Sequence, residues 1–261
     1  MLRLAANLST LFTEAPLDAR FEAAASAGFR GVEIQFPYEL PATRVHEQLR
    51  ASGVHLVLFN APPGDMARGE RGLASLPGRE ADFRASIARA LDYATAAACR
   101  RVHVMSGMRV PEIAREAQLA ILRDNVAVAA ELAASAGVML MLEPINPVDV
   151  PGYLLGDTTT ALDVMAAVAS PNVGLQFDFY HQQIIAGDLA RRFTALLPRI
   201  GHLQLADNPG RHEPGTGEIN YPWLLAQVAG SAYDGWVGCE YLPSRDTAAS
   251  LAWARPFLQA E

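Results

Sequence analysis

Four side chains that can bind a cation or move a proton each close a short apolar run in the second half of the chain. The runs are MLMLE, VGLQFD, GHLQ and WVGCE, and they end at Glu143, Asp178, Gln204 and Glu240. A carboxylate at the end of a buried strand is energetically costly unless something compensates its charge. Carboxylate and amide oxygens are the ligands that hard divalent cations prefer. The pattern therefore indicates an enzyme with metal-assisted chemistry.

Each of the four residues could instead cap a helix or form an ion pair at the start of a loop. The repetition at one topological position favours a shared site. Three carboxylates and one amide oxygen suit Mg²⁺ or Mn²⁺ better than zinc, which prefers histidine and cysteine ligands.

The chain contains no lysine, so all 21 basic residues are arginines. Schiff-base aldolases, pyridoxal phosphate enzymes and Walker A phosphate loops all need a lysine amine. The sequence excludes these classes, and GTGEIN at 215–220 is not a nucleotide loop.

The elements that must position these side chains alternate between short apolar runs and amphipathic segments. Strands are expected at 2–9, 31–36, 55–60, 101–106, 138–143, 173–178, 200–205 and 235–240. Helices are expected at 16–27, 42–51, 80–98, 112–135, 158–168, 184–197, 221–229 and 247–258, with Asp157 as an N-cap. Eight strand–helix units predict an α/β fold, a (β/α)8 TIM barrel, as a single domain over residues 1–261. An open doubly wound sheet is the alternative, but no GxGxxG follows the first strand.

In such a barrel, strands five to eight are neighbours about 4.8 Å apart, so the side chains at their ends can converge. The long segment 61–78 follows the third strand and lies on the face where barrel enzymes keep their sites. Loops of this length usually carry function, and this one could act as a lid.

Further polar residues lie close to the four in sequence. His181 follows Asp178 by three residues and could bind a substrate oxygen or shuttle a proton, although a packing role is equally compatible. Asp149 could hydrogen-bond a substrate hydroxyl or His181. Asn7 and Asn60, with Glu33, stand near strand ends and could line the pocket.

Three arginines are candidates for holding an anionic substrate: Arg68, Arg71 and Arg211. Arginine binds carboxylates through two parallel hydrogen bonds, and no lysine is present to do so instead. Taken singly, each is more often a solvated surface charge. The remaining histidines considered, His46, His55 and His202, are interpreted as structural, and His103 is given no role.

Bulk composition limits the partners. The net charge is −7 without a basic block, which argues against nucleic acid. No apolar run approaches the roughly 18–20 residues needed to cross a membrane, and the first residues are interpreted as a strand rather than a signal peptide. The two cysteines, Cys99 and Cys239, are too few for a disulfide scaffold and suggest buried thiols in the cytoplasm.

Six segments resemble the hydroxypyruvate isomerase family, with the related 2-oxo-tetronate isomerases, in the xylose-isomerase-like superfamily of TIM barrels. They are FRGVEIQFPY (29–38), NAPPGD with GERG (60–72), LEPINPVDVPGY (142–153), QFDFYHQQ (176–183), GHLQLADNPGRHEPGTGEINY (201–221) and GWVGCEY (235–241). The resemblance implies that Glu143 and Glu240 are paired acid/base carboxylates and also metal ligands. Asp178 and Gln204 would complete the metal shell. Many relatives in the superfamily carry histidine where this chain has Gln204, and the glutamine is typical of the closer subgroup.

The implied reaction interconverts hydroxypyruvate and tartronate semialdehyde by proton transfer through an enediolate. The partner would be a small keto acid or keto sugar, and barrels of this size often form homodimers. A 2-oxo-tetronate isomerase, a sugar 3-epimerase or a dehydratase on the same barrel starts with the same proton abstraction. A metal-dependent nuclease should show more histidines and a basic surface. A non-catalytic small-molecule binder would not need paired carboxylates on a metal.

Overall fold

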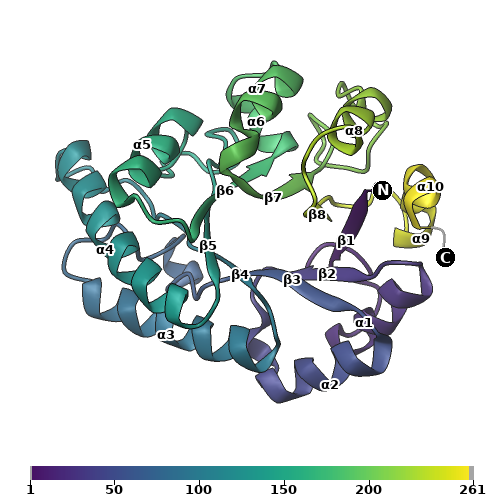
Figure 1. Ribbon diagram of the computed structural model, residues 1–261, viewed down its shortest axis with the longest axis horizontal. Coiled ribbons are helices and arrows are strands. Elements are labelled where there is room, and N and C mark those ends of the chain that lie inside the picture. The colour runs from purple at the N-terminus through teal and green to yellow at the C-terminus, as the bar shows by residue number, and fades with distance from the viewer. Residues whose placement is uncertain (1, 259–261) are drawn as a thin grey trace.

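Eight parallel strands close into a barrel in the computed structural model, which describes residues 2–258 (Figure 1). The strands are β1 (Arg3–Asn7), β2 (Gly31–Ile34), β3 (His55–Asn60), β4 (Arg101–His103), β5 (Met139–Leu142), β6 (Val173–Asp178), β7 (Ile200–Leu205) and β8 (Trp236–Cys239). Each strand pairs with its neighbours in sequence, and β8 pairs with β1. The predicted TIM barrel is confirmed.

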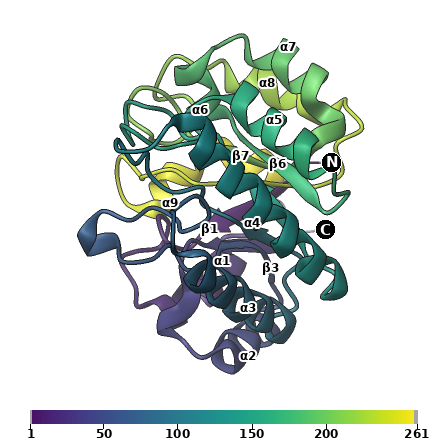
Figure 2. The same cartoon turned by 90° about the vertical axis from the view of Figure 1, so that its left-hand side faces the viewer.

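Helices cover the outside of the barrel, and Figure 2 shows α2, α3 and α4 side by side along it. The helices are α1 (Leu17–Ser26), α2 (Ala42–Ser52), α3 (Glu80–Ala96), α4 (Arg115–Ser135), α5 (Thr158–Val168), α6 (Phe179–Ile185), α7 (Leu189–Leu196), α8 (Tyr221–Ala229), α9 (Thr247–Ser250) and α10 (Arg255–Leu258). Short 3-10 helices are η1 (Pro37–Glu39), η2 (Met66–Arg68), η3 (Leu197–Arg199) and η4 (Leu251–Ala254). Within residues 2–258, none of these helices combines the length and the apolar character that crossing a bilayer requires.

Two predicted helices are wrong in detail. The segment expected at 184–197 is divided between α6, which begins directly after β6, and α7. Gly187 and Asp188 between them both have positive φ, 62° and 49°, which a right-handed helix cannot accommodate. The segment expected at 247–258 is three short pieces, α9, η4 and α10.

Several predicted strands run beyond the hydrogen-bonded ladder. Strand β1 ends at Asn7 and β4 ends at His103, although Leu8 and Val104 remain buried. Each still donates one backbone hydrogen bond to the neighbouring strand, Leu8 N–H to the Glu33 carbonyl at 2.7 Å and Val104 N–H to that of Met141 at 2.9 Å. The apolar runs therefore overestimate the regular strands by a few residues, because an apolar run records burial and not the ladder itself. Strand β6 ends at its polar residue, Asp178, which pairs in register with Gln204, and Gln204 pairs in turn with Gly238.

The segment after β3 is anchored at its base and exposed at its tip. Residues 73–75 are buried, whereas 64–69 are exposed. Gly72 has φ 113°, and a side chain there would overlap the backbone of Met105, so the chain passes closely over the end of β4. The exposed tip includes η2 and is the part of this loop that could move.

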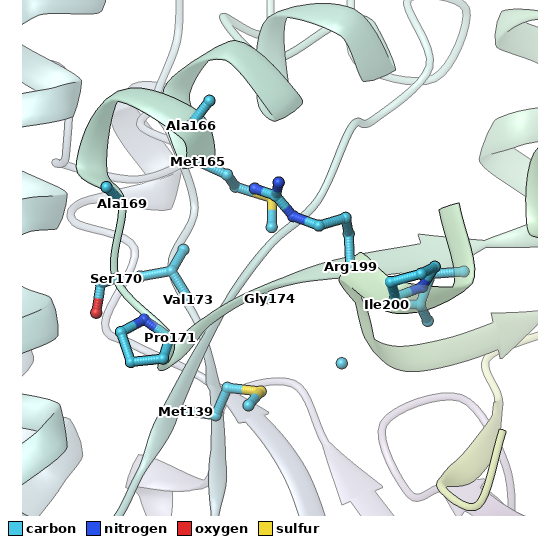
Figure 3. A pocket seen from close by; sticks show the side chains of 12 residues that line it. Met139, Met165, Ala166, Ala169, Ser170, Pro171, Val173, Gly174, Arg199 and Ile200 are labelled. Atoms are coloured by element: carbon cyan, nitrogen blue, oxygen red, sulfur yellow. The ribbon is translucent and has the colours of Figure 1, made fainter. Parts of the chain in front are cut away.

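A cavity of about 610 Å³ opens at the amino-terminal ends of β5, β6 and β7 (Figure 3). Met139, Val173 and Ile200, which begin these strands, lie around it. Gly174 and Gly201 supply no side chains to fill the space. This end of the barrel is opposite the end at which the four predicted residues lie.

The N-cap predicted at Asp157 is confirmed, because its side chain accepts a hydrogen bond from the Thr160 backbone N–H at 2.8 Å. We expect Asp157→Ala to destabilise the protein by about 1 kcal/mol, lowering the thermal midpoint by about 2–4 °C. Asp163→Ala is the matched control, since this exposed aspartate lies within the same helix. Thermal unfolding followed by circular dichroism measures both, and equal midpoints would contradict the capping role.

Candidate active site

Three buried residues place ligand atoms within 4.8 Å of one another: Glu143, Asp178 and His181. Glu143 lies one residue beyond β5, and Asp178 is the last residue of β6. Asp178 also caps α6, because its Oδ1 accepts the Tyr180 backbone N–H at 2.9 Å. Its Oδ2 is buried and has no hydrogen-bond partner among residues 2–258. A buried carboxylate oxygen left free in this way suits a cation.

His181 lies at the edge of this cluster, with Nε2 at 3.7 Å from Asp178 Oδ2. Its other ring nitrogen, Nδ1, faces Asn146, whose side-chain Nδ2 is 2.7 Å away and whose backbone N–H donates to it at 3.4 Å. Burial lowers the pKa of His181 well below its ordinary value, and Arg211 and His103 lower it further. The ring is therefore neutral and carries its proton on Nε2. In this tautomer it donates toward the site, and ligating a cation through Nε2 requires the other tautomer.

Glu240 lies one residue beyond β8 and is held by four donors. Its Oε1 accepts from Gln35 Nε2 at 2.9 Å and Arg211 Nη2 at 2.8 Å. Its Oε2 accepts from Gln204 Nε2 at 2.5 Å and Asn7 Nδ2 at 3.2 Å. This carboxylate is not part of the three-residue cluster. The Arg211 guanidinium contacts both Glu240 and Asp178 and so connects this carboxylate to the cluster.

Gln204 presents its amide nitrogen, not its oxygen, to Glu240. Gln204 Oε1 accepts from Gln176 Nε2 at 2.6 Å. Ligation of a cation by Gln204 would use this oxygen, so the predicted set of four ligands is brought to one end of the barrel but not arranged as one shell.

Arg211 is the predicted arginine that enters the site. Its guanidinium lies 3.6 Å from Asp149 and 4.0 Å from Asp178, and its carbon Cζ stacks 5.1 Å from the centre of the Tyr180 ring. Its backbone is left-handed, with φ 54°, so the loop after β7 is bent at the residue that delivers the charge.

Arg68 and Arg71 are placed differently. Arg68 is exposed on η2, and Arg71 Nη1 donates to the carbonyl oxygens of Met66 and Glu70 in its own loop. Across residues 2–258, neither forms an ion pair with Glu143, Asp178 or Glu240. In this conformation, the expectation that they hold a substrate carboxylate depends on movement of the loop.

Asp149 does not hydrogen-bond His181, contrary to one of the two expectations for it. The Tyr180 hydroxyl donates to Asp149 Oδ1 at 3.2 Å, and it is Asn146 that hydrogen-bonds His181 Nδ1. Asp149 therefore braces Arg211 and Tyr180 at the rim.

Burial and mutual repulsion determine the protonation of the site. Burial raises the pKa of Glu143 well above its ordinary value, and the charges of Glu240 and Asp178 raise it further, while Arg211 and a hydrogen bond from Gln176 lower it. Burial likewise raises the pKa of Asp178 to about 7, against the lowering effect of Arg211. The pKa of Glu240 is raised by burial as well. With these raised pKa values, Glu143 and Asp178 hold protons more readily than exposed carboxyl groups do, and a divalent cation would take the place of those protons.

Sequence reasoning missed several residues that contact the site. His103 Nδ1 lies 3.7 Å from Glu143 Oε2 and 3.3 Å from Asn60 Oδ1, and burial lowers its pKa to about 3, so the ring is neutral. Its position at the end of β4, in register with Asn60, was the available signal. Gln176, Gln35 and Asn146 gave no signal, because amides are common in loops and strands alike.

The sequence and the fold match known proteins along nearly the whole chain. The profile of the xylose isomerase-like TIM barrel family matches residues 21–257. The 2-oxo-tetronate isomerase of Cupriavidus necator is 47% identical over 99% of both chains. The hydroxypyruvate isomerase of Escherichia coli (strain K12) is 44% identical over 98% of this chain and 100% of its own. A crystal structure of a Brucella melitensis protein named AP endonuclease, family 2, has a TM-score of 0.96 at 44% identity, covering 98% of this chain and 99% of that chain.

These matches agree with the architecture, since the barrel and the polar ends of its strands are what the family resemblance implied. The chain therefore belongs to the xylose isomerase-like TIM barrel family and, within it, to the isomerases that include hydroxypyruvate isomerase and 2-oxo-tetronate isomerase.

Proposed function

We propose that the protein interconverts hydroxypyruvate and tartronate semialdehyde with the help of Mg²⁺ or Mn²⁺. The observation that carries the proposal is the pair of buried glutamates, Glu143 and Glu240, on either side of Asp178 at one end of the barrel. The names of the full-length relatives support the same reaction class.

The proposed reaction moves two protons and leaves the carbon skeleton unchanged. One glutamate removes a proton from the carbinol carbon of the substrate, and the other gives a proton to the former carbonyl carbon. The hydroxyl proton of the carbinol passes to the former carbonyl oxygen, close to the Nε2–H of His181. A bound divalent cation would supply polarisation of the carbonyl and stabilisation of the enediolate charge. Glu143 and Asp178 would hold it, with Gln204 as a further ligand.

Arg211 is the proposed partner of the substrate carboxylate. It stands among the site carboxylates with a planar, permanently charged group, and carboxylates bind this group through two hydrogen bonds. The loop tip that bears Arg68 and Arg71 would close over the bound substrate and keep water out.

A 2-oxo-tetronate is the second candidate substrate, because it offers the same carboxylate, carbonyl and adjacent hydroxyl on a longer chain. Two relatives identical to this chain at 44% or more carry that name. A comparison of kcat/KM for the two substrates separates these candidates. The keto sugar substrate of a sugar 3-epimerase has no carboxylate, so it would not use the proposed role of Arg211.

A nuclease is the rival suggested by the name of the Brucella melitensis structure. The net charge of −7 opposes binding to a phosphate backbone. Of the six histidines, only His103 and His181 lie beside Glu143 and Asp178, and a multinuclear zinc site needs more histidine ligands than these two.

Both cysteines are free and buried, which supports the proposed cytoplasmic location. A homodimer stays a prediction.

Proton NMR of the purified protein with hydroxypyruvate in D₂O tests the proposal. We expect conversion to tartronate semialdehyde with solvent deuterium at the former carbonyl carbon, which is the carbinol carbon of the product. Conversion should depend on Mg²⁺ or Mn²⁺ and be abolished by a chelator. Proton abstraction by a side chain that exchanges with solvent explains the label. Neither conversion nor exchange with any divalent cation, on hydroxypyruvate or on 2-oxo-tetronate, would sink the proposal.

Replacing Glu143 by glutamine should lower kcat by about 10²–10⁴-fold, because the amide keeps the shape but cannot transfer the proton. Glu131→Gln is the control, since Glu131 is exposed on the outer helix α4. Turnover is measured with saturating Mn²⁺ so that weaker metal binding does not limit the rate. Unimpaired turnover would end the acid/base assignment of Glu143.

A further inference from the structure

A second pair of polar side chains lies inside the barrel, outside the cluster of Glu143, Asp178 and His181. Glu33 on β2 and His202 on β7 are both 0% exposed, and His202 Nε2 contacts Glu33 Oε1. The interior of such barrels is mostly filled by apolar side chains, and burying polar groups there costs desolvation free energy that their hydrogen bonds must offset. The pair therefore needs an explanation other than stability.

The barrel leaves space for this carboxylate. A Cβ added at Gly238 on β8 would overlap both carboxylate oxygens of Glu33. The absence of a side chain at this position of β8 thus allows Glu33 to reach across the interior.

The second oxygen of Glu33 is connected to the proposed catalytic residues. Glu33 Oε2 accepts from Gln204 Nε2 at 2.9 Å and from Asn7 Nδ2 at 3.2 Å. The same two nitrogen atoms donate to Glu240 Oε2. Two amides therefore bridge the two carboxylates.

This arrangement leaves Gln204 a single orientation. A primary amide has two N–H hydrogens, and both of those on Gln204 go to carboxylates. Its Oε1 then faces the opposite way and accepts from Gln176, which also hydrogen-bonds Glu143. Turning the amide over would bring its oxygen against two carboxylates and its N–H group against that of Gln176.

We propose that Glu33, held by His202, is a positioning residue that orients the Gln204 amide and, through it, Glu240. Glu33 has this role because it lies deep in the barrel and is fixed by His202, whereas Glu240 must reach the substrate. The role for Glu240 rests on the proposed function. The orientation of Gln204, and hence of the oxygen it can offer a cation, does not.

Glu33→Met and Glu33→Gln test the proposal together. Methionine has a similar length but no acceptor, so we expect kcat and Mn²⁺ affinity each to fall about 10–100-fold, with KM nearly unchanged. The glutamine side chain keeps one acceptor oxygen for the Gln204 amide. Its own amide N–H can donate to His202 Nε2 if the imidazole proton lies on Nδ1 instead, and Nδ1 has no hydrogen-bond partner in residues 2–258. Glu33→Gln should therefore restore most of both losses.

Mn²⁺ binding is measured by calorimetry and turnover by NMR, and Met141→Leu serves as a control for a conservative change inside the barrel. Wild-type values in Glu33→Met would overturn the proposal. Equal losses in Glu33→Gln and Glu33→Met would also overturn it, because the charge and not the amide orientation would then matter.

Two further outcomes remain decisive. If the wild type turns over neither keto acid, the proposed function fails, and Mn²⁺ affinity alone still decides the positioning role. Absence of Mn²⁺ binding by the wild type would overturn both.

If Glu33→Met does not fold, Gly238→Ala displaces the Glu33 carboxylate without changing a charge. The same loss of Mn²⁺ affinity is expected, and unchanged affinity would overturn the proposal.

Discussion

The burial of several carboxyl groups close together at one end of the barrel is the constraint on which the rest of the site depends. Glu143, Asp178 and Glu240 are nearly or fully buried, and Arg211 contacts two of them. An acid whose pKa is raised on folding destabilises the fold as pH rises from its unfolded value toward its folded value. For Asp178 that window runs from 3.8 to about 7. A cation that binds the ionised carboxylates would offset this loss of folding stability, which explains why several carboxyl groups are buried together.

The barrel creates this constraint by bringing one polar residue from each strand to the same edge. Parallel strands have the same direction, so residues that are far apart in sequence lie in register. The loops then adapt to the charge: Arg211 adopts a left-handed backbone to reach Glu240, and α6 begins at once after β6, which engages one oxygen of Asp178 in a helix cap. Fold and electrostatics are thus linked at the strand ends.

The barrel and the four strand-end residues could be predicted from the sequence because both depend on periodicity. Apolar runs mark buried strands, and a polar residue that closes a run marks the edge where the site forms. The partners of these residues could not be predicted. Whether His181 meets Asp149 or Asn146 depends on loop conformation, and an apolar pattern does not record it.

Interior polar residues were the other limit. His202 was interpreted as structural because a lone histidine in an apolar run gives no sign of its partner. Its partner Glu33 lies 169 positions away and reaches it only because Gly238 has no side chain. The hydrogen bonds that hold Arg71 within its own loop could not be predicted either, because the sequence shows charge and loop length but not these contacts.

A divalent cation bound by Glu143 and Asp178 would compensate these buried carboxylates. Anomalous diffraction from crystals of the protein grown with Mn²⁺ would locate such a cation. We expect one strong anomalous peak within coordination distance of a Glu143 oxygen and of Asp178 Oδ2. A peak elsewhere, or no peak at saturating Mn²⁺ with both carboxylates ordered, would contradict it.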